Sequence, residues 1–184
     1  MKAIREAADQ DLQWSSNKVG LFKDEFELRS GDEVLSILHA GEKSTDWTCG
    51  EAADGRWALK SRNIGSGEIV VITELDSQAE IAVVKHGRKQ GLFRRDNDYI
   101  EFSDGRILTW KKASKWHDEW DWVDSDERPL IHFQRGHHVM IEPLSLPELS
   151  LLVIAGWHLM KLQEEARTKA AVATTTSSYV VVNH

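Results

Sequence analysis

The chain has a single cysteine, Cys49, and only three prolines. A lone cysteine has no partner for an internal disulfide, so the sequence favours a reducing compartment and we expect a cytoplasmic protein. The first residues lack the apolar run of a secretory signal peptide. The longest apolar stretch, residues 149–162, contains Ser150, Gly156, His158 and Lys161. It is also shorter than the ~20 apolar residues of a membrane span, so we expect no transmembrane helix.

Positive charge is also scarce, because 23 Lys and Arg face 30 Asp and Glu, for a formal net charge of -7. Dedicated nucleic-acid binders usually carry a net basic surface, so we expect no nucleic-acid partner. The chain has no Gly-X-Ser-X-Gly elbow, and the glycine-rich residues 64–67 lack the Gly-Lys-Ser/Thr ending of a P-loop. One cysteine and scattered histidines do not make a zinc site. We therefore expect no metal, no cofactor and no enzymatic activity.

What the sequence does contain is a long region of period-two alternation, from Phe22 to Ile141. It holds about twelve short strand candidates with turn residues every 8 to 12 residues or so, which is typical of a β-sandwich or barrel. Asp54-Gly55 and Asp104-Gly105 are the sharpest turn signals and predict type I′ hairpins. No long helical crossover is evident, so a parallel sheet is not expected.

The pattern changes after Ser145-Leu146-Pro147-Glu148, which matches a helix capping box between Ser145 and Glu148. The residues that follow, 149–162, are apolar around nearly the whole circumference of a helix. A helix without a polar face has to be enclosed on all sides. The sequence therefore predicts that strands of the same chain wrap this helix.

We thus predict a mainly β fold, an antiparallel twelve-stranded closed barrel or strongly curved sheet around one buried C-terminal hydrophobic helix. The domain spans residues 21–168, with the central helix at 147–167. Residues 1–20 are expected to form an accessory segment with a short helix, because Ile4, Ala8 and Leu12 have helical spacing, followed by a turn at residues 15–18. Residues 169–184 are expected to be a loose tail, with a Thr- and Val-rich part that has strand propensity.

Twelve short strands followed by a single apolar helix resemble the tubby C-terminal-like superfamily, which includes phospholipid scramblases and the plant LURP-one-related proteins. The likeness covers residues 22–165 and is carried by residues 57–60, 69–72, 81–84 and 147–162. The resemblance implies a helix threaded through a twelve-stranded barrel and, for tubby proteins, phosphoinositide binding through basic residues. The cysteine cluster and proline-rich N-terminus of scramblases are missing here, so lipid scrambling is not carried over.

A basic region is the first candidate site. Residues 85–91 indicate a hairpin turn whose cations converge on one rim, joined by lysines of a later turn. Converging cations suit phosphate groups, which arginine binds bidentately, and they attract anionic lipid surfaces. The alternative is a solvated hairpin whose charges protect a sheet edge from aggregation. The candidate ligand-binding residues are Lys85, Arg88, Lys89, Arg94, Arg95, Lys111 and Lys112.

An acidic region is the second candidate, and its members are Asp118, Glu119, Asp121, Asp124, Asp126 and Glu127. Asp124 and Asp126 have the spacing of a calcium loop, but the glycine and the terminal glutamate of an EF-hand are missing. The preferred interpretation is a strand with an outward Asp121 between two inward tryptophans, then an acidic turn. His158 is expected to be a hydrogen-bonded buried histidine, and Cys49 a small hydrophobe within a strand.

For function, the sequence favours a non-enzymatic binding module for anionic lipid head groups or another phosphate-bearing ligand. Such a protein would be cytoplasmic and would reach a membrane only peripherally. A protein-interaction or structural domain with a protein partner and no small-molecule ligand is nearly as well supported. An enzyme of unrecognised type ranks third, since no catalytic motif is present.

Overall fold

The computed structural model describes residues 1–18, 24–40, 47–64, 67–87, 89–90, 94–95, 97–114, 116–134, 136–142 and 146–179. These described residues form one short 3-10 helix, fourteen strands and one α-helix. In chain order they are η1 (Ile4–Ala7), β1 (Leu12–Lys18), β2 (Asp24–Ser30), β3 (Glu33–His39), β4 (Trp47–Ala52), β5 (Gly55–Ile64), β6 (Gly67–Glu74), β7 (Ala79–Lys85), β8 (Lys89–Gln90), β9 (Arg94–Arg95), β10 (Asp98–Phe102), β11 (Ile107–Lys112), β12 (Trp120–Val123), β13 (Pro129–Phe133), β14 (His138–Ile141) and α1 (Leu149–Tyr179).

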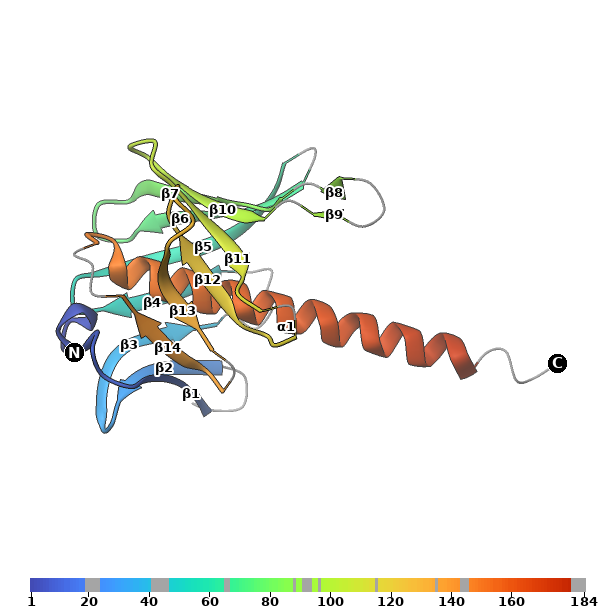
Figure 1. Ribbon diagram of the computed structural model, residues 1–184, viewed down its shortest axis with the longest axis horizontal. Coiled ribbons are helices and arrows are strands. Elements are labelled where there is room, and N and C mark those ends of the chain that lie inside the picture. The colour runs from blue at the N-terminus through green and yellow to red at the C-terminus, as the bar shows by residue number, and fades with distance from the viewer. Residues whose placement is uncertain are drawn as a thin grey trace.

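Twelve strands close into an antiparallel barrel in the order β1-β14-β13-β12-β11-β10-β7-β6-β5-β4-β3-β2 (Figure 1). Consecutive strands pair with each other, except that β7 pairs with β10 and β1 closes the barrel against β14. β8 and β9 form a separate hairpin between β7 and β10. The predicted mainly β, twelve-stranded closed barrel is confirmed, while the strand expected at residues 92–93 lies outside the described residues. Each barrel strand has a neighbour on both sides, which removes exposed sheet edges.

Helix α1 runs through this barrel (Figure 1), and residues 149–159 are buried without a break. Different strands of the barrel pack on it. Trp14 of β1 stacks on Trp157 with ring centroids 5.3 Å apart, and Trp122 of β12 donates its Nε1–H to the carbonyl of Leu152 over 2.9 Å. The prediction that the helix is enclosed by its own chain is confirmed. No helix in the described part of the chain is long and apolar enough to cross a membrane.

Gly156 lets the barrel wall approach the helix closely. A Cβ at this position would lie 2.3 Å from Cζ of Phe133 and 3.0 Å from Nε1 of Trp122. Both aromatic side chains are fully buried, at 1% and 0% exposure. Glycine costs a helix interior about 1 kcal/mol relative to alanine, so the close packing of the two rings is what requires it here.

Both predicted hairpins form, but neither uses the predicted turn. Ala52 pairs with Gly55, so the β4–β5 turn consists of Ala53 and Asp54, one residue earlier than expected. Between β10 and β11, the N–H of Gly105 donates to the carbonyl of Phe102 over 2.9 Å, and Gly105 has a φ of 87°. A tight turn followed by a left-handed glycine is the usual three-residue hairpin loop, in place of the predicted type I′ turn.

The N-terminal segment departs from the prediction. Residues 1–20 were expected to be accessory to the barrel, yet β1 pairs with both β2 and β14 and closes the barrel. Leu12 and Trp14 are buried whereas Gln13 and Ser15 are exposed, which is the alternation of a strand with one face in the core. The polar residues 15–18, predicted as a turn, continue that strand. The short helix near Ile4 exists as η1, and its Ile4 and Ala7 are buried.

The C-terminal segment also differs. A loose tail was expected from residue 169, but helix α1 continues to Tyr179. Strand propensity of Thr and Val is a weak preference, and a helix already formed and anchored in the barrel extends at low cost because propagation is far easier than nucleation. From residue 160 to residue 169 the side chains are partly or fully exposed. The helix therefore projects beyond the barrel at one end (Figure 1), which we call the exit end.

Candidate functional site

The basic hairpin lies at the exit end. β7 and β10 pair from Ala82↔Phe102 to Lys85↔Tyr99, and the chain between them continues as the small β8–β9 ladder. In Figure 1 this ladder extends past the barrel on the side where α1 emerges. Lys89 pairs with Arg95 and Gln90 with Arg94, so three of the predicted ligand residues share one two-stranded ladder. Arg88, also predicted, lies outside the described residues.

The root of this hairpin is held by Asp98, whose side chain is buried. Its Oδ1 accepts a hydrogen bond from the backbone N–H of Gly87 over 3.0 Å. Its Oδ2 lies 3.1 Å from Nδ1 of His86. One carboxylate thus joins the first residues of the hairpin to the start of β10. This contact positions the hairpin on the barrel rim.

The other predicted lysines each have an acidic partner on the barrel. Lys85 forms an ion pair with Glu101 on the neighbouring strand β10, and this hydrogen bond raises the pKa of Lys85. Nζ of Lys111 lies 3.1 Å from Glu127, and Nζ of Lys112 lies 3.7 Å from Asp118. All three charges are therefore balanced within the chain. Three of the remaining cations of the predicted set, Lys89, Arg94 and Arg95, lie on the β8–β9 ladder.

The loop between β11 and β12 is a neighbouring connection at the same end, because β11 pairs with β10. Ala113 N donates to the carbonyl of Glu119 over 2.8 Å and closes the loop. Within it, Ser114 Oγ accepts from the backbone N–H groups of Trp116 and His117, both over 3.2 Å. Asp118 bonds Nη1 of Arg167 on α1 over 2.5 Å, which lowers the pKa of Asp118. The loop is thus tied to the emerging helix.

Trp116 is the residue of this region whose role the sequence did not reveal. Its side chain is 89% exposed, whereas Trp122 is fully buried and Trp120 stacks on Trp110 with centroids 5.5 Å apart. The three tryptophans lie on one stretch of the sequence, and the sequence favours a core position for Trp120 and Trp122. The structure confirms the core position of Trp122. The run of polar residues around Trp116, from Ser114 to Glu119, is the signal that marks it as a loop residue.

His158 lies directly inside the exit end, on the buried part of α1. His158 is buried as predicted, and among the described residues its Nε2 has no hydrogen-bond partner, so the predicted hydrogen bond is not found at this nitrogen. Burial, with a smaller contribution from nearby His86, lowers the pKa of His158 to about 4. The imidazole is therefore neutral at physiological pH. The sequence could not show this, because the residues that surround His158 come from distant strands.

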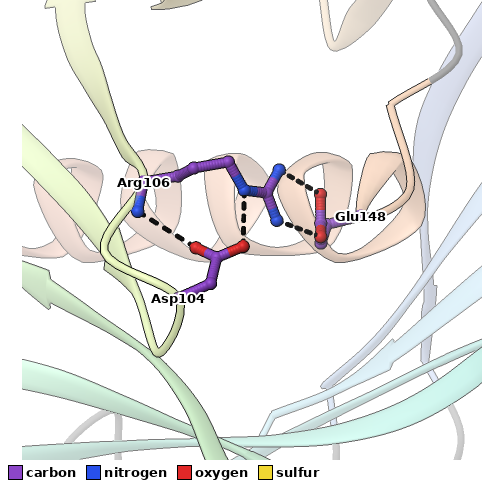
Figure 2. A network of polar contacts seen from close by, with 3 residues as sticks. All are labelled: Asp104, Arg106 and Glu148. Atoms are coloured by element: carbon purple, nitrogen blue, oxygen red, sulfur yellow. Dashed lines mark hydrogen bonds and ion pairs between the residues drawn. The ribbon is translucent and has the colours of Figure 1, made fainter.

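The opposite end of the barrel carries an ion-pair network, shown in Figure 2. Arg106, just before β11, bonds both carboxylate oxygens of Glu148, with Nη1 and Oε2 3.0 Å apart. Its Nε also donates to Asp104 over 2.6 Å, and Asp104 accepts from the Arg106 backbone over 3.0 Å. These bonds raise the pKa of Arg106 and lower that of Asp104. The capping box predicted for Glu148 involves Ser145, outside the described residues, and Glu148 instead anchors the start of α1 to the β10–β11 hairpin.

The acidic region is occupied by contacts within the chain. Asp124 Oδ1 accepts from the backbone N–H groups of Asp126 and Arg128, both over 2.9 Å, and this lowers the pKa of Asp124. Asp121 lies 2.5 Å from Nδ1 of its cross-strand partner His132, and the acid that the sequence predicts to point outward is buried. Over the described residues, no cluster of side chains has the composition of a metal site.

Cys49 is buried in β4, as expected for a small hydrophobe. Burial raises the pKa of its thiol, with Glu51 adding to the effect. Thiolate is the reactive form of cysteine, so this side chain is an inert part of the wall.

Comparison with known proteins adds no assignment: no protein-family model, no curated protein and no solved structure matches the chain.

Proposed function

We propose that this protein is a non-enzymatic binding module for an anionic, phosphate-bearing ligand, such as a lipid head group, with the β8–β9 hairpin as its ligand surface. The observation that carries the proposal is the register of this hairpin, which sets Lys89 opposite Arg95 and places Arg94 next to them. Like charges directly opposite each other in an antiparallel pair are destabilising. A bound anion removes that repulsion.

The size of the hairpin strengthens this reasoning. Each of its strands has two residues, and a short isolated two-stranded ladder is marginal in water. Two arginines and a lysine on such a ladder supply charge-assisted hydrogen bonds to phosphate oxygens, and arginine does so bidentately. Because Lys85, Lys111 and Lys112 are already paired with acids, we assign them to the scaffold that supports the hairpin.

We further propose that the chain is a member of the tubby C-terminal-like superfamily. A closed twelve-stranded barrel around a buried C-terminal helix is the architecture that this resemblance implies. Membership supports an anionic ligand, since tubby proteins bind phosphoinositide head groups. We infer a cytoplasmic protein that reaches membranes only peripherally, on the basis of its single, buried cysteine.

A second candidate function is a protein-interaction module. It is favoured by the part of α1 beyond residue 160, which leaves the barrel and continues to Tyr179. A helix that extends beyond its barrel offers a surface to a partner helix or groove.

Charge reversal on the hairpin tests the proposed function. We expect Arg94→Glu with Arg95→Glu to weaken binding of soluble inositol hexakisphosphate about 100-fold, since each arginine–phosphate contact is worth about 1.5–3 kcal/mol. Isothermal titration calorimetry measures the affinity. The control is Lys2→Glu with Arg5→Glu, which changes the net charge equally but lies near η1 at the other end. Equal losses in both variants, or no binding by the unmodified protein, would rule out the hairpin as an anion site.

A further inference from the structure

The geometry points to a membrane-contacting surface at the exit end, in which Trp116 inserts into the lipid interface while the β8–β9 hairpin binds anionic head groups. This inference rests on the proposed function and specifies the source of the phosphate groups as a bilayer surface. Its starting point is the exposure of Trp116, which at 89% exceeds that of every other large hydrophobic residue in the described part of the chain.

Backbone contacts of the described residues hold the segment that carries Trp116. The loop is closed by the Ala113–Glu119 backbone bond, and Ser114 Oγ fixes the backbone of Trp116 and His117. Asp118 ties it to Arg167 of α1. A large aromatic side chain gains from burial, yet these contacts hold Trp116 in water. An external apolar or interfacial phase is what would cover it.

The position of the loop favours a lipid surface as that phase. β10 and β11 are neighbours in the barrel, so the hairpin before β10 and the loop after β11 are adjacent connections at the same end. A bilayer presents phosphate groups outside and a carbonyl-rich interface a few ångströms deeper, and tryptophan prefers that interface. The cationic hairpin and Trp116 match these two layers.

The charges around Trp116 are compatible with such contact. Asp118, the nearest acid with a defined partner, is paired with both Arg167 and Lys112. A negative charge neutralised by two cations opposes approach to an anionic surface far less than a free carboxylate.

Vesicle binding by a Trp116→Ser variant tests the inference. We expect its partition onto phosphatidylcholine vesicles containing phosphatidylserine, measured by flotation, to fall about tenfold or more, since insertion of an aromatic side chain is lost. The control is Ile107→Ser, which removes an exposed hydrophobic residue from the opposite end of β11, 51% exposed, and should leave partition unchanged. Because Trp116 packs in no core, thermal unfolding of both variants should match the unmodified protein.

Binding of soluble inositol hexakisphosphate separates this inference from the proposed function. We expect Trp116→Ser to retain full affinity for the soluble probe, because only insertion is lost. The other outcome is that Trp116→Ser partitions onto vesicles as well as the unmodified protein does, while the soluble probe still binds. In that case Trp116 serves another class of partner, such as a protein. The membrane inference would then be wrong, and the proposed anion-binding function would stand. If the unmodified protein binds neither vesicles nor inositol hexakisphosphate, both the membrane inference and the proposed function are wrong.

Discussion

Replacing Gly156 with alanine is expected to destabilise the barrel by about 2 kcal/mol, although alanine is the better helix former. The added methyl group would meet Phe133 Cζ at 2.3 Å and Trp122 Nε1 at 3.0 Å. Overpacking a filled core costs about 3 kcal/mol when neighbours cannot move, and the gain in helix propensity offsets about 1 kcal/mol of it. Equilibrium denaturation in urea measures the loss.

A second substitution shows whether the clash with the ring is the cause. In the double variant Gly156→Ala/Phe133→Leu the smaller side chain gives the methyl group room, so the two changes should cost less together than the sum of their separate effects. A coupling of at least about 1 kcal/mol is expected for residues in such contact. Strict additivity, or a stabilising Gly156→Ala change, would mean that the helix does not lie against this wall.

Acidification is expected to destabilise the fold through His158. In the unfolded chain an imidazole is protonated below pH 6.5, whereas in the folded protein the pKa of His158 is lowered to about 4. Between these values the unfolded state binds the additional proton, so stability is full above pH 6.5 and falls as the pH drops. This one group accounts for a loss of about 2 kcal/mol on going from pH 7 to pH 5.

The variant His158→Leu isolates this effect from the other titrating groups. Leucine cannot take up a proton, so the stability of the variant should fall about 2 kcal/mol less than that of the unmodified protein between pH 7 and pH 5. At pH 7 the substitution should be close to neutral, because an apolar group replaces a buried nitrogen that lacks a partner in the described residues. Parallel pH profiles for the two proteins would show that His158 is hydrated or otherwise free to ionise.

The fold was largely predictable because it depends on patterns that are local in sequence. Alternation and β-branched residues mark strands such as β6 and β7, and the all-round apolar character of residues 149–162 requires enclosure. The errors occurred where local preference opposes the tertiary contacts. The polar residues 15–18 have turn character, but the buried Trp14 carries them into a barrel strand. Threonine favours strands, but the Thr-rich residues near the C-terminus extend a helix that has already formed.

The candidate site was less predictable because its decisive contacts are non-local. The sequence locates the basic hairpin, and the β8–β9 ladder agrees with that location. It does not show that Lys85 is paired with Glu101, because β7 pairs with β10 across the intervening hairpin. The placement of the Trp116 loop also depends on the β11–β12 register and on Arg167, which is 49 residues along the chain from its partner Asp118.

Mapping of backbone amide chemical shifts during a titration with inositol hexakisphosphate tests most directly whether the exit-end hairpin is the ligand surface. We expect saturable shifts concentrated between residues 85 and 98, while amides around Arg106 and Glu148 at the opposite end remain unchanged. Saturable shifts centred elsewhere on the barrel, or none at all, would contradict the assignment of this hairpin as an anion-binding surface.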